Sequence, residues 1–270
     1  MEARPISHRT HGSQHGPITR LVSPGDLGRI LKPFVFVDYF HAPNGFEGGG
    51  FGWHPHSGIA TITVLLEGSA WARETVGERH PLQSGDVEFM RAGGGVWHTG
   101  GSEGTGGQRG VQLWVSLPPQ LENAPARSDY IHAGQIPSVG GARVIAGTYQ
   151  GVRGPIQEPE DIALLDVSLE NGTWTFEGID QHNVLWLLPT IGTVTVDGER
   201  VDHGELVILR PGATVLQAEG SARVLLGSGI RRQHPLVLGP YSVHTSRDAL
   251  RKGHERIVEI GRELSAAGMI

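Results

Sequence analysis

The sequence predicts an all-β protein made of two β-barrels, with one α-helix at its C-terminal end. The chain of 270 residues contains 41 glycines and 17 prolines against 4 tyrosines and 7 phenylalanines. So many turn-forming residues favour short strands joined by tight turns. The β-rich segments are closely spaced and separated by glycines, which is typical of sandwiches and barrels. A similar order of features occurs twice, which predicts two related units.

The strands expected in the first half follow one another at short intervals. Each is rich in β-branched or aromatic residues, and each ends at a glycine, an acidic residue or a proline pair. The segments are ATITVLLEG (60–68), SAWARET (69–75), GDVEFMRAGG (85–94) and VQLWVSLPP (111–119). We expect these strands to form one barrel within residues 1–130.

A segment rich in proline, alanine, serine and glycine at residues 123–141 separates the two halves. The β pattern then returns in VLWLLPTIGTVTVDG (184–198) and in GELVILRPG (204–212). The second of these resembles SGDVEFMRAGG (84–94), because both place an acidic residue after glycine, then an apolar strand, then a glycine turn. We therefore expect an internal duplication, with the second barrel in residues 131–270.

The C-terminal residues 245–264 show a different periodicity. Leu250, Ile257, Ile260 and Leu264 recur at spacings of seven, three and four, which is the apolar stripe of an amphipathic helix. Thr245 and Asp248 are candidates for a capping pair at its start. We expect one helix here, as the last element of the second half.

Composition excludes several functional classes. The net charge of −6 disfavours a nucleic-acid partner, because phosphate binding requires clustered Lys and Arg. Cysteine is absent, which rules out thiolate metal sites and cysteine nucleophiles. No apolar run approaches the roughly 18 residues of a membrane span, and no signal peptide is visible. We expect a cytoplasmic protein without a membrane partner.

Three histidines carry the main functional prediction. His54 and His56 flank Pro55, and residues two apart on a strand point to the same face. This pair alone predicts little, because many such pairs bind nothing. His98 follows the glycine run of RAGGGVWHTGG (91–101), which lets the backbone turn back toward the pair. Three imidazoles from two strands suit a divalent transition metal such as Fe, Ni, Cu or Zn.

The chain resembles the pirins, a family within the cupin superfamily. The stretches that carry the resemblance are LKPFVFVDYF (31–40), HPHSGIATITVLLEGSAWARETVG (54–77), SGDVEFMRAGGGVWH (84–98), VQLWVSLP (111–118) and HPLVLGPYSVHTSRDAL (234–250). The resemblance implies a bicupin, that is, two cupin barrels, with a metal in the N-terminal barrel only. It implies one metal ion per chain, with iron as the first choice and Ni, Cu, Zn or Mn as alternatives.

The implied ligands are three histidines and one glutamate. The histidines match His54, His56 and His98, but the position of the family glutamate, two residues after the last histidine, is Gly100. Other cupins carry a carboxylate four or five residues after the histidine pair, where this chain has Ala60 and Thr61. Glu103 is close in sequence and is a candidate substitute, although a solvated loop acid is the alternative interpretation.

The remaining candidates have structural alternatives. His41 could line the first barrel, but it also fits a hydrogen-bonded strand end. Trp53 and Trp97 directly precede His54 and His98, and we expect them to pack in the core with one face on the cavity. In the second half His182 and His203 are isolated, which predicts no metal there.

Three functional hypotheses follow. Some pirins cleave flavonols such as quercetin with dioxygen, which implies a quercetin 2,3-dioxygenase type of enzyme with a small aromatic substrate. Pirins are also described as transcriptional cofactors and modulators of metabolic enzymes, and a net acidic chain would then act through a protein partner. The third hypothesis is a cupin whose metal site is weak or empty, because the ligand set is incomplete.

Overall fold

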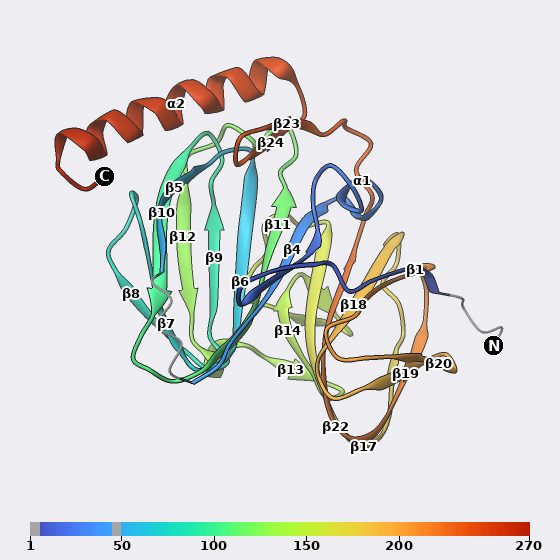
Figure 1. Cartoon of the computed structure of the whole chain (residues 1–270). Helices are drawn as coiled ribbons and strands as arrows, with labels where there is room; N and C mark the ends of the chain where they lie inside the picture. The colour runs from blue at the N-terminus through green and yellow to red at the C-terminus, as the bar shows by residue number, and fades with distance from the viewer. Residues whose placement is uncertain (1–5, 45–49) are drawn as a thin grey trace. The chain divides into compact units, whose positions relative to one another are not determined.

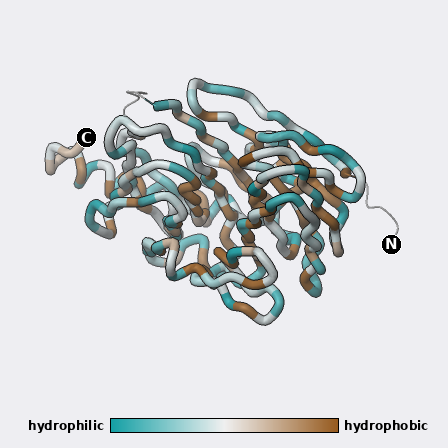
Figure 2. The backbone as a smooth tube through the Cα atoms, turned by 90° about the horizontal axis from the view of Figure 1, so that it is seen from below, coloured by the Kyte–Doolittle hydropathy of each residue, from teal (hydrophilic) through white to brown (hydrophobic). Residues whose placement is uncertain are grey.

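The computed structural model describes residues 6–44 and 50–270, which fold into two compact units. Of the described residues, the first unit contains 14–44, 50–133 and 232–270, and the second contains 6–13 and 134–231. Both consist mainly of β-strands, as predicted (Figure 1). Figure 2 shows short hydrophobic and hydrophilic stretches that alternate along much of the chain, as expected where one face of each sheet is buried.

Two sheets build the first unit. One has seven strands in the order β12-β9-β6-β11-β4-β3-β2, and the other has four in the order β5-β10-β7-β8. A short helix α1 precedes β4, and a hairpin of β23 and β24 leads into helix α2. The bounds are β2 (Ser13–His15), β3 (Ile18–Val22), α1 (Gly28–Leu31), β4 (Phe34–Ala42), β5 (Phe51–His56), β6 (Ile59–Glu67), β7 (Ser69–Glu74), β8 (His80–Gln83), β9 (Val87–Arg91), β10 (Val96–Ser102), β11 (Gln108–Ser116), β12 (Arg127–Ile131), β23 (Val237–Gly239), β24 (Ser242–His244) and α2 (Arg247–Ala266).

The second unit has one large sheet in the order β1-β21-β18-β22-β17-β14-β13, with β19 and β20 attached beside β22, and a separate hairpin of β15 and β16. Its interior is filled by apolar side chains from these strands, Val, Leu and Phe among them. The bounds are β1 (Ile6–Thr10), η1 (Ala133–Gln135), β13 (Ser138–Val139), β14 (Ala142–Ala146), β15 (Thr148–Tyr149), β16 (Val152–Arg153), β17 (Ile162–Phe176), β18 (Val184–Ile191), β19 (Val194–Val196), β20 (Glu199–Val201), β21 (Leu206–Leu209) and β22 (Thr214–Gly229).

The division into units differs from the two continuous halves, 1–130 and 131–270, that the sequence suggested. Strand β1 pairs antiparallel with β21 and so joins the second unit. Helix α2 packs on β10, β5, β23 and β24 and so joins the first unit. Both exchanges depend on contacts between residues far apart in the chain, which a composition shift cannot reveal.

Helix α2 confirms the predicted C-terminal helix and corrects its cap. Ser246 is the N-cap, and its side chain accepts a hydrogen bond from the Ala249 amide. Of the predicted stripe, Ile257, Ile260 and Leu264 are buried, whereas Leu250 is only half-buried. The indole of Trp97 donates to the Ile257 carbonyl at 2.7 Å and fastens the helix to β10.

Candidate metal centre

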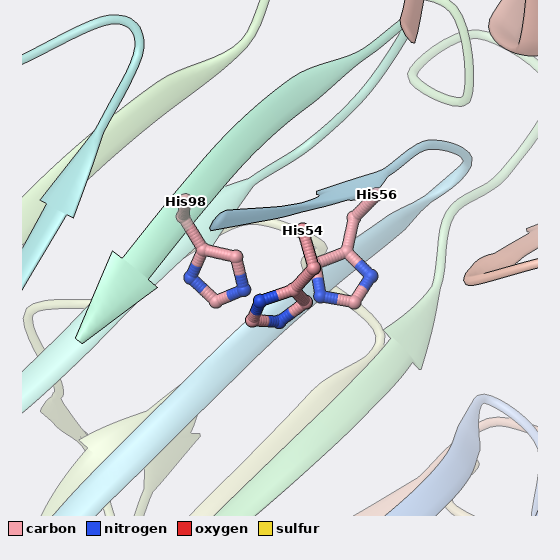
Figure 3. A group of neighbouring side chains, drawn as sticks. All are labelled: His54, His56 and His98. Atoms are coloured by element: carbon pink, nitrogen blue, oxygen red, sulfur yellow. The ribbon is translucent and has the colours of Figure 1, made fainter. Parts of the chain in front are cut away.

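His54, His56 and His98 lie together in the first unit, as the sequence predicted. Strands β5 and β10 are antiparallel neighbours in which His98 is in register with His54, and Val96 with His56. Side chains of residues in register lie on the same face of a sheet. The ring centroids are 4.2 Å apart for His54 and His98, 4.9 Å for His56 and His98, and 5.0 Å for His54 and His56. The nearest ring nitrogens of all three lie within 4.8 Å of one another, and Figure 3 shows the rings gathered between the strands.

Backbone carbonyls fix the orientation of two of these rings. Nδ1 of His54 donates to the Gly52 carbonyl at 2.8 Å, and Nδ1 of His56 donates to the Tyr241 carbonyl at 3.0 Å. A carbonyl only accepts, so each ring is protonated at Nδ1 and its Nε2 keeps a free lone pair. Nε2 of His56 and Nε2 of His98 are buried and have no hydrogen-bond partner. Buried polar atoms without partners are rare, so this donor set fits a cation bound between the rings.

The electrostatics of the three rings favour their neutral form. Burial lowers the pKa of all three, and it lowers the pKa of His56 to about 3 with the help of the neighbouring His54. A metal ligand must be an unprotonated nitrogen. The site is therefore ready to bind a cation at neutral pH without first losing protons.

A cavity of about 990 Å³ opens beside the histidines within the first unit. Trp53 lines the cavity, as predicted. Trp97 was also expected to line it, but it is not among the lining residues and instead hydrogen-bonds with helix α2. Trp114 stacks on Phe36 with ring centroids 4.1 Å apart, and its ring is T-shaped to that of His56 with centroids 4.9 Å apart. His41 is exposed at the end of β4 and does not belong to the cluster.

Gly100 stands two residues after His98, at the position where the resemblance to pirins implied a glutamate ligand. A Cβ atom on Gly100 would lie 2.9 Å from the Trp71 carbonyl oxygen, so the backbone here is packed around a glycine. Glu103 is not a member of the histidine cluster, which corrects the suggested substitute. Its side chain is 44% exposed and forms an ion pair with Arg79 at 3.2 Å.

Two buried polar groups of the first unit were missed by the sequence reasoning. The first is a pair of buried carboxyl groups. Glu88 on β9 is 4% exposed and Glu74 on β7 is 1% exposed, although both are acidic residues. Burial and the neighbouring Glu74 raise the pKa of Glu88. The signal was present in the sequence, because Glu88 stands inside the apolar stretch DVEFM. A charged residue in a buried strand is expected to have a specific role or partner.

The second missed group is a chain of hydrogen bonds behind His56. Ser57 Oγ lies 3.0 Å from Nε2 of His244, and Nδ1 of His244 lies 3.2 Å from Oε2 of Glu122. The three residues are far apart in the sequence. Only the folded chain brings them together.

The fold and the site define a class of protein: a bicupin with a three-histidine centre in one of its barrels. The family model for pirin matches residues 18–115. A pirin-like protein of Caulobacter vibrioides is 33% identical over 240 residues, which cover 84% of this chain and 86% of that protein. This chain belongs to the pirin family.

Solved structures agree with this fold. The crystal structure named quercetin 2,3-dioxygenase from Acinetobacter baumannii matches with a TM-score of 0.80 at 26% identity, over 94% of each chain. The bacterial pirin YhhW from Escherichia coli, solved in complex with nickel(II), matches with a TM-score of 0.65 at 19% identity, over 85% of this chain and 98% of that one. Among the described residues, no helix is long and apolar enough to cross a bilayer.

Proposed function

We propose that this protein is a metal-dependent dioxygenase that acts on a flavonol or a related hydroxylated aromatic compound, with His54, His56 and His98 as the metal ligands. The observation that carries the proposal is the set of buried ring nitrogens without partners at the wall of a large cavity. The similarity to a structure named quercetin 2,3-dioxygenase supports the choice of substrate class.

The chain's own residues suit an aromatic ligand. Trp114, Phe36 and Trp53 give the cavity flat apolar walls, against which an aromatic ring can stack. The three imidazoles are held by neighbouring strands, and two of them are oriented by backbone carbonyls. A bound ion would supply a Lewis acid and an anchor for a hydroxyl oxygen. Three nitrogen ligands suit iron, and they suit nickel or copper as well.

The test combines metal content with turnover. The purified protein, without a histidine tag, is loaded with Fe(II), dialysed and measured by elemental analysis. Oxygen uptake is then followed with quercetin and with luteolin, which lacks the 3-hydroxyl group. We expect about one ion per chain and oxygen uptake with quercetin only. His98→Ala should lose both, whereas His41→Ala, which changes an exposed histidine outside the cluster, should keep both.

Other outcomes separate the remaining interpretations. Stoichiometric metal without oxygen uptake would contradict the dioxygenase and favour a regulatory role through a protein partner. Failure to bind Fe(II), Ni(II), Cu(II), Zn(II) or Mn(II) would contradict the metal centre itself.

A further inference from the structure

A row of polar residues crosses the inner face of the seven-stranded sheet in the first unit. Each member is in register with the next on the neighbouring strand, so their side chains share one face. From β3 to the edge strand β12 the row is Arg20, Asp38, Gln112, Thr63, Glu88 and Tyr130. All except Tyr130 line the cavity. The row therefore places a line of polar side chains in the wall of a cavity that also has aromatic and aliphatic walls.

Most of this row is satisfied within the protein, and one carboxyl oxygen of Glu88 is the exception, although Glu88 also hydrogen-bonds with Glu74 and Thr63. Arg20 and Asp38 form a two-point ion pair at 2.8 and 2.9 Å. The Tyr130 hydroxyl donates to Oε1 of Glu74 at 2.5 Å. Oε1 of Glu88 is buried without a hydrogen-bond partner, and so is Oε2 of Glu74. Glu88 thus presents an acceptor that the protein itself does not use.

Glu74 connects this acceptor to the histidine cluster. It is in register with His98 on the neighbouring strand β7, and it hydrogen-bonds with Glu88 of the other sheet. Residues in register lie about 5 Å apart at Cβ. The unused carboxyl oxygens therefore lie within the length of a small aromatic molecule from the metal ligands.

A second, independent group in the cavity also lacks a partner. The indole Nε1 of Trp114 is buried without an acceptor, and its ring packs against that of His56 in a T-shaped arrangement. The cavity thus offers one unused donor and one unused acceptor besides the histidine nitrogens. Native structures seldom leave such groups unpaired, and a ligand with hydroxyl groups would satisfy both.

We propose that Glu88 is a second recognition point of the cavity for an aromatic ligand. The carboxyl group of Glu88 accepts a hydrogen bond from one hydroxyl group of this ligand, and another oxygen of the same ligand binds at His54, His56 and His98. This inference rests on the proposed function and makes it more specific. The ligand class is a polyhydroxylated, uncharged aromatic compound. A ligand that carries a carboxylate would be disfavoured beside Glu88 and Glu74.

The experiment compares two ligands and three variants. Dissociation constants are measured by tryptophan fluorescence on the metal-loaded and on the metal-free full chain, with quercetin and with 3-hydroxyflavone, which lacks the additional hydroxyl groups. Glu88→Leu removes the acceptor, and Glu88→Gln keeps the shape but cannot ionise. Glu67→Gln is the matched control, because Glu67 is a half-exposed residue on β6 that pairs with Arg109 outside the cavity.

In the metal-loaded protein, Glu88→Leu should weaken quercetin binding at least tenfold more than it weakens 3-hydroxyflavone binding, as expected for a lost hydrogen bond to a buried carboxyl group. Glu88→Gln should show a smaller difference in the same direction, and it retains a folded protein if the leucine variant does not fold. Glu67→Gln should match the wild type for both ligands.

Three results would overturn the proposal: equal losses for the two ligands, no loss, or no binding of quercetin by the wild type. The ligand comparison is independent of turnover. A selective loss without oxygen uptake in the wild type would retain Glu88 as a binding residue and reject the dioxygenase. Turnover that is unchanged in both Glu88 variants would retain the dioxygenase and reject this role of Glu88.

Discussion

Ser57 and His244 are joined by a hydrogen bond of 3.0 Å between Oγ and Nε2, next to His56 of the histidine cluster. Glu122 extends the chain on the other side of the imidazole, so the order serine, histidine, glutamate resembles a nucleophilic relay. Ser57 has no exposed surface, however, and no substrate can reach it. The network instead fastens the segment before helix α2 to the strand that carries His56, whose ring is also held by the Tyr241 carbonyl.

This role predicts the effect of Glu122→Ala. The carboxylate of Glu122 accepts from Nδ1 of His244, and from the amide and the hydroxyl group of Thr245 at 2.6 Å each. Its loss leaves buried donors unpaired, which should cost about 2–4 kcal/mol in the free energy of unfolding. Urea denaturation measures this. The control is Glu255→Ala, which removes only an exposed ion pair with Arg251 and should cost less than about 0.5 kcal/mol. Equal effects of the two variants would contradict the role of the network.

The substitution Gly100→Ala tests whether the backbone at this position requires glycine. The added Cβ would lie 2.9 Å from the Trp71 carbonyl oxygen, so the strand must shift. We expect a loss of about 1–2 kcal/mol in the free energy of unfolding. Gly52→Ala is the matched control on β5, because its Cβ would meet no atom within 4 Å. If Gly100→Ala is as stable as Gly52→Ala, a glutamate could have been accommodated here and its absence has no steric cause.

Strand periodicity, the glycine run before His98 and the resemblance to pirins together predicted the histidine cluster, but not its surroundings. His54 and His56 share a face because the side-chain period of a strand is two, and the glycines before His98 marked the turn that returns to them. Glu103 was wrong as a substitute ligand because sequence proximity does not show that Arg79 engages it. Sequence cannot reveal which strands become neighbours, so the link from His98 through Glu74 to Glu88 required the fold.

The burial of Glu88 should make the free energy of unfolding depend on pH. Its pKa is raised from 4.5 to about 8, so its favourable contribution is fully present below pH 4.5 and is lost as the pH rises toward 8. Glu88→Gln does not titrate and leaves no second carboxyl beside Glu74. Its melting temperature should be close to that of the wild type near pH 5 and exceed it at pH 8, by about 2–4 °C for each kcal/mol that the wild type loses. A difference that is the same at both pH values would show that Glu88 does not carry this shift.

Metal binding should depend only weakly on pH near neutrality. Burial holds the pKa of His54, His56 and His98 below the ordinary value of 6.5, so protons do not compete for the ring nitrogens between pH 8 and 6.5. Solvated histidines with pKa values near 6.5 would lose affinity across the lower part of this range.

Isothermal titration with Ni(II) at pH 8.0, 7.0 and 6.5 should give dissociation constants within about threefold of one another, after correction for buffer binding. His98→Ala supplies the background from metal bound elsewhere on the chain. A wild-type affinity that falls in parallel with this background would place the bound ion on exposed histidines and remove the metal centre from the first unit.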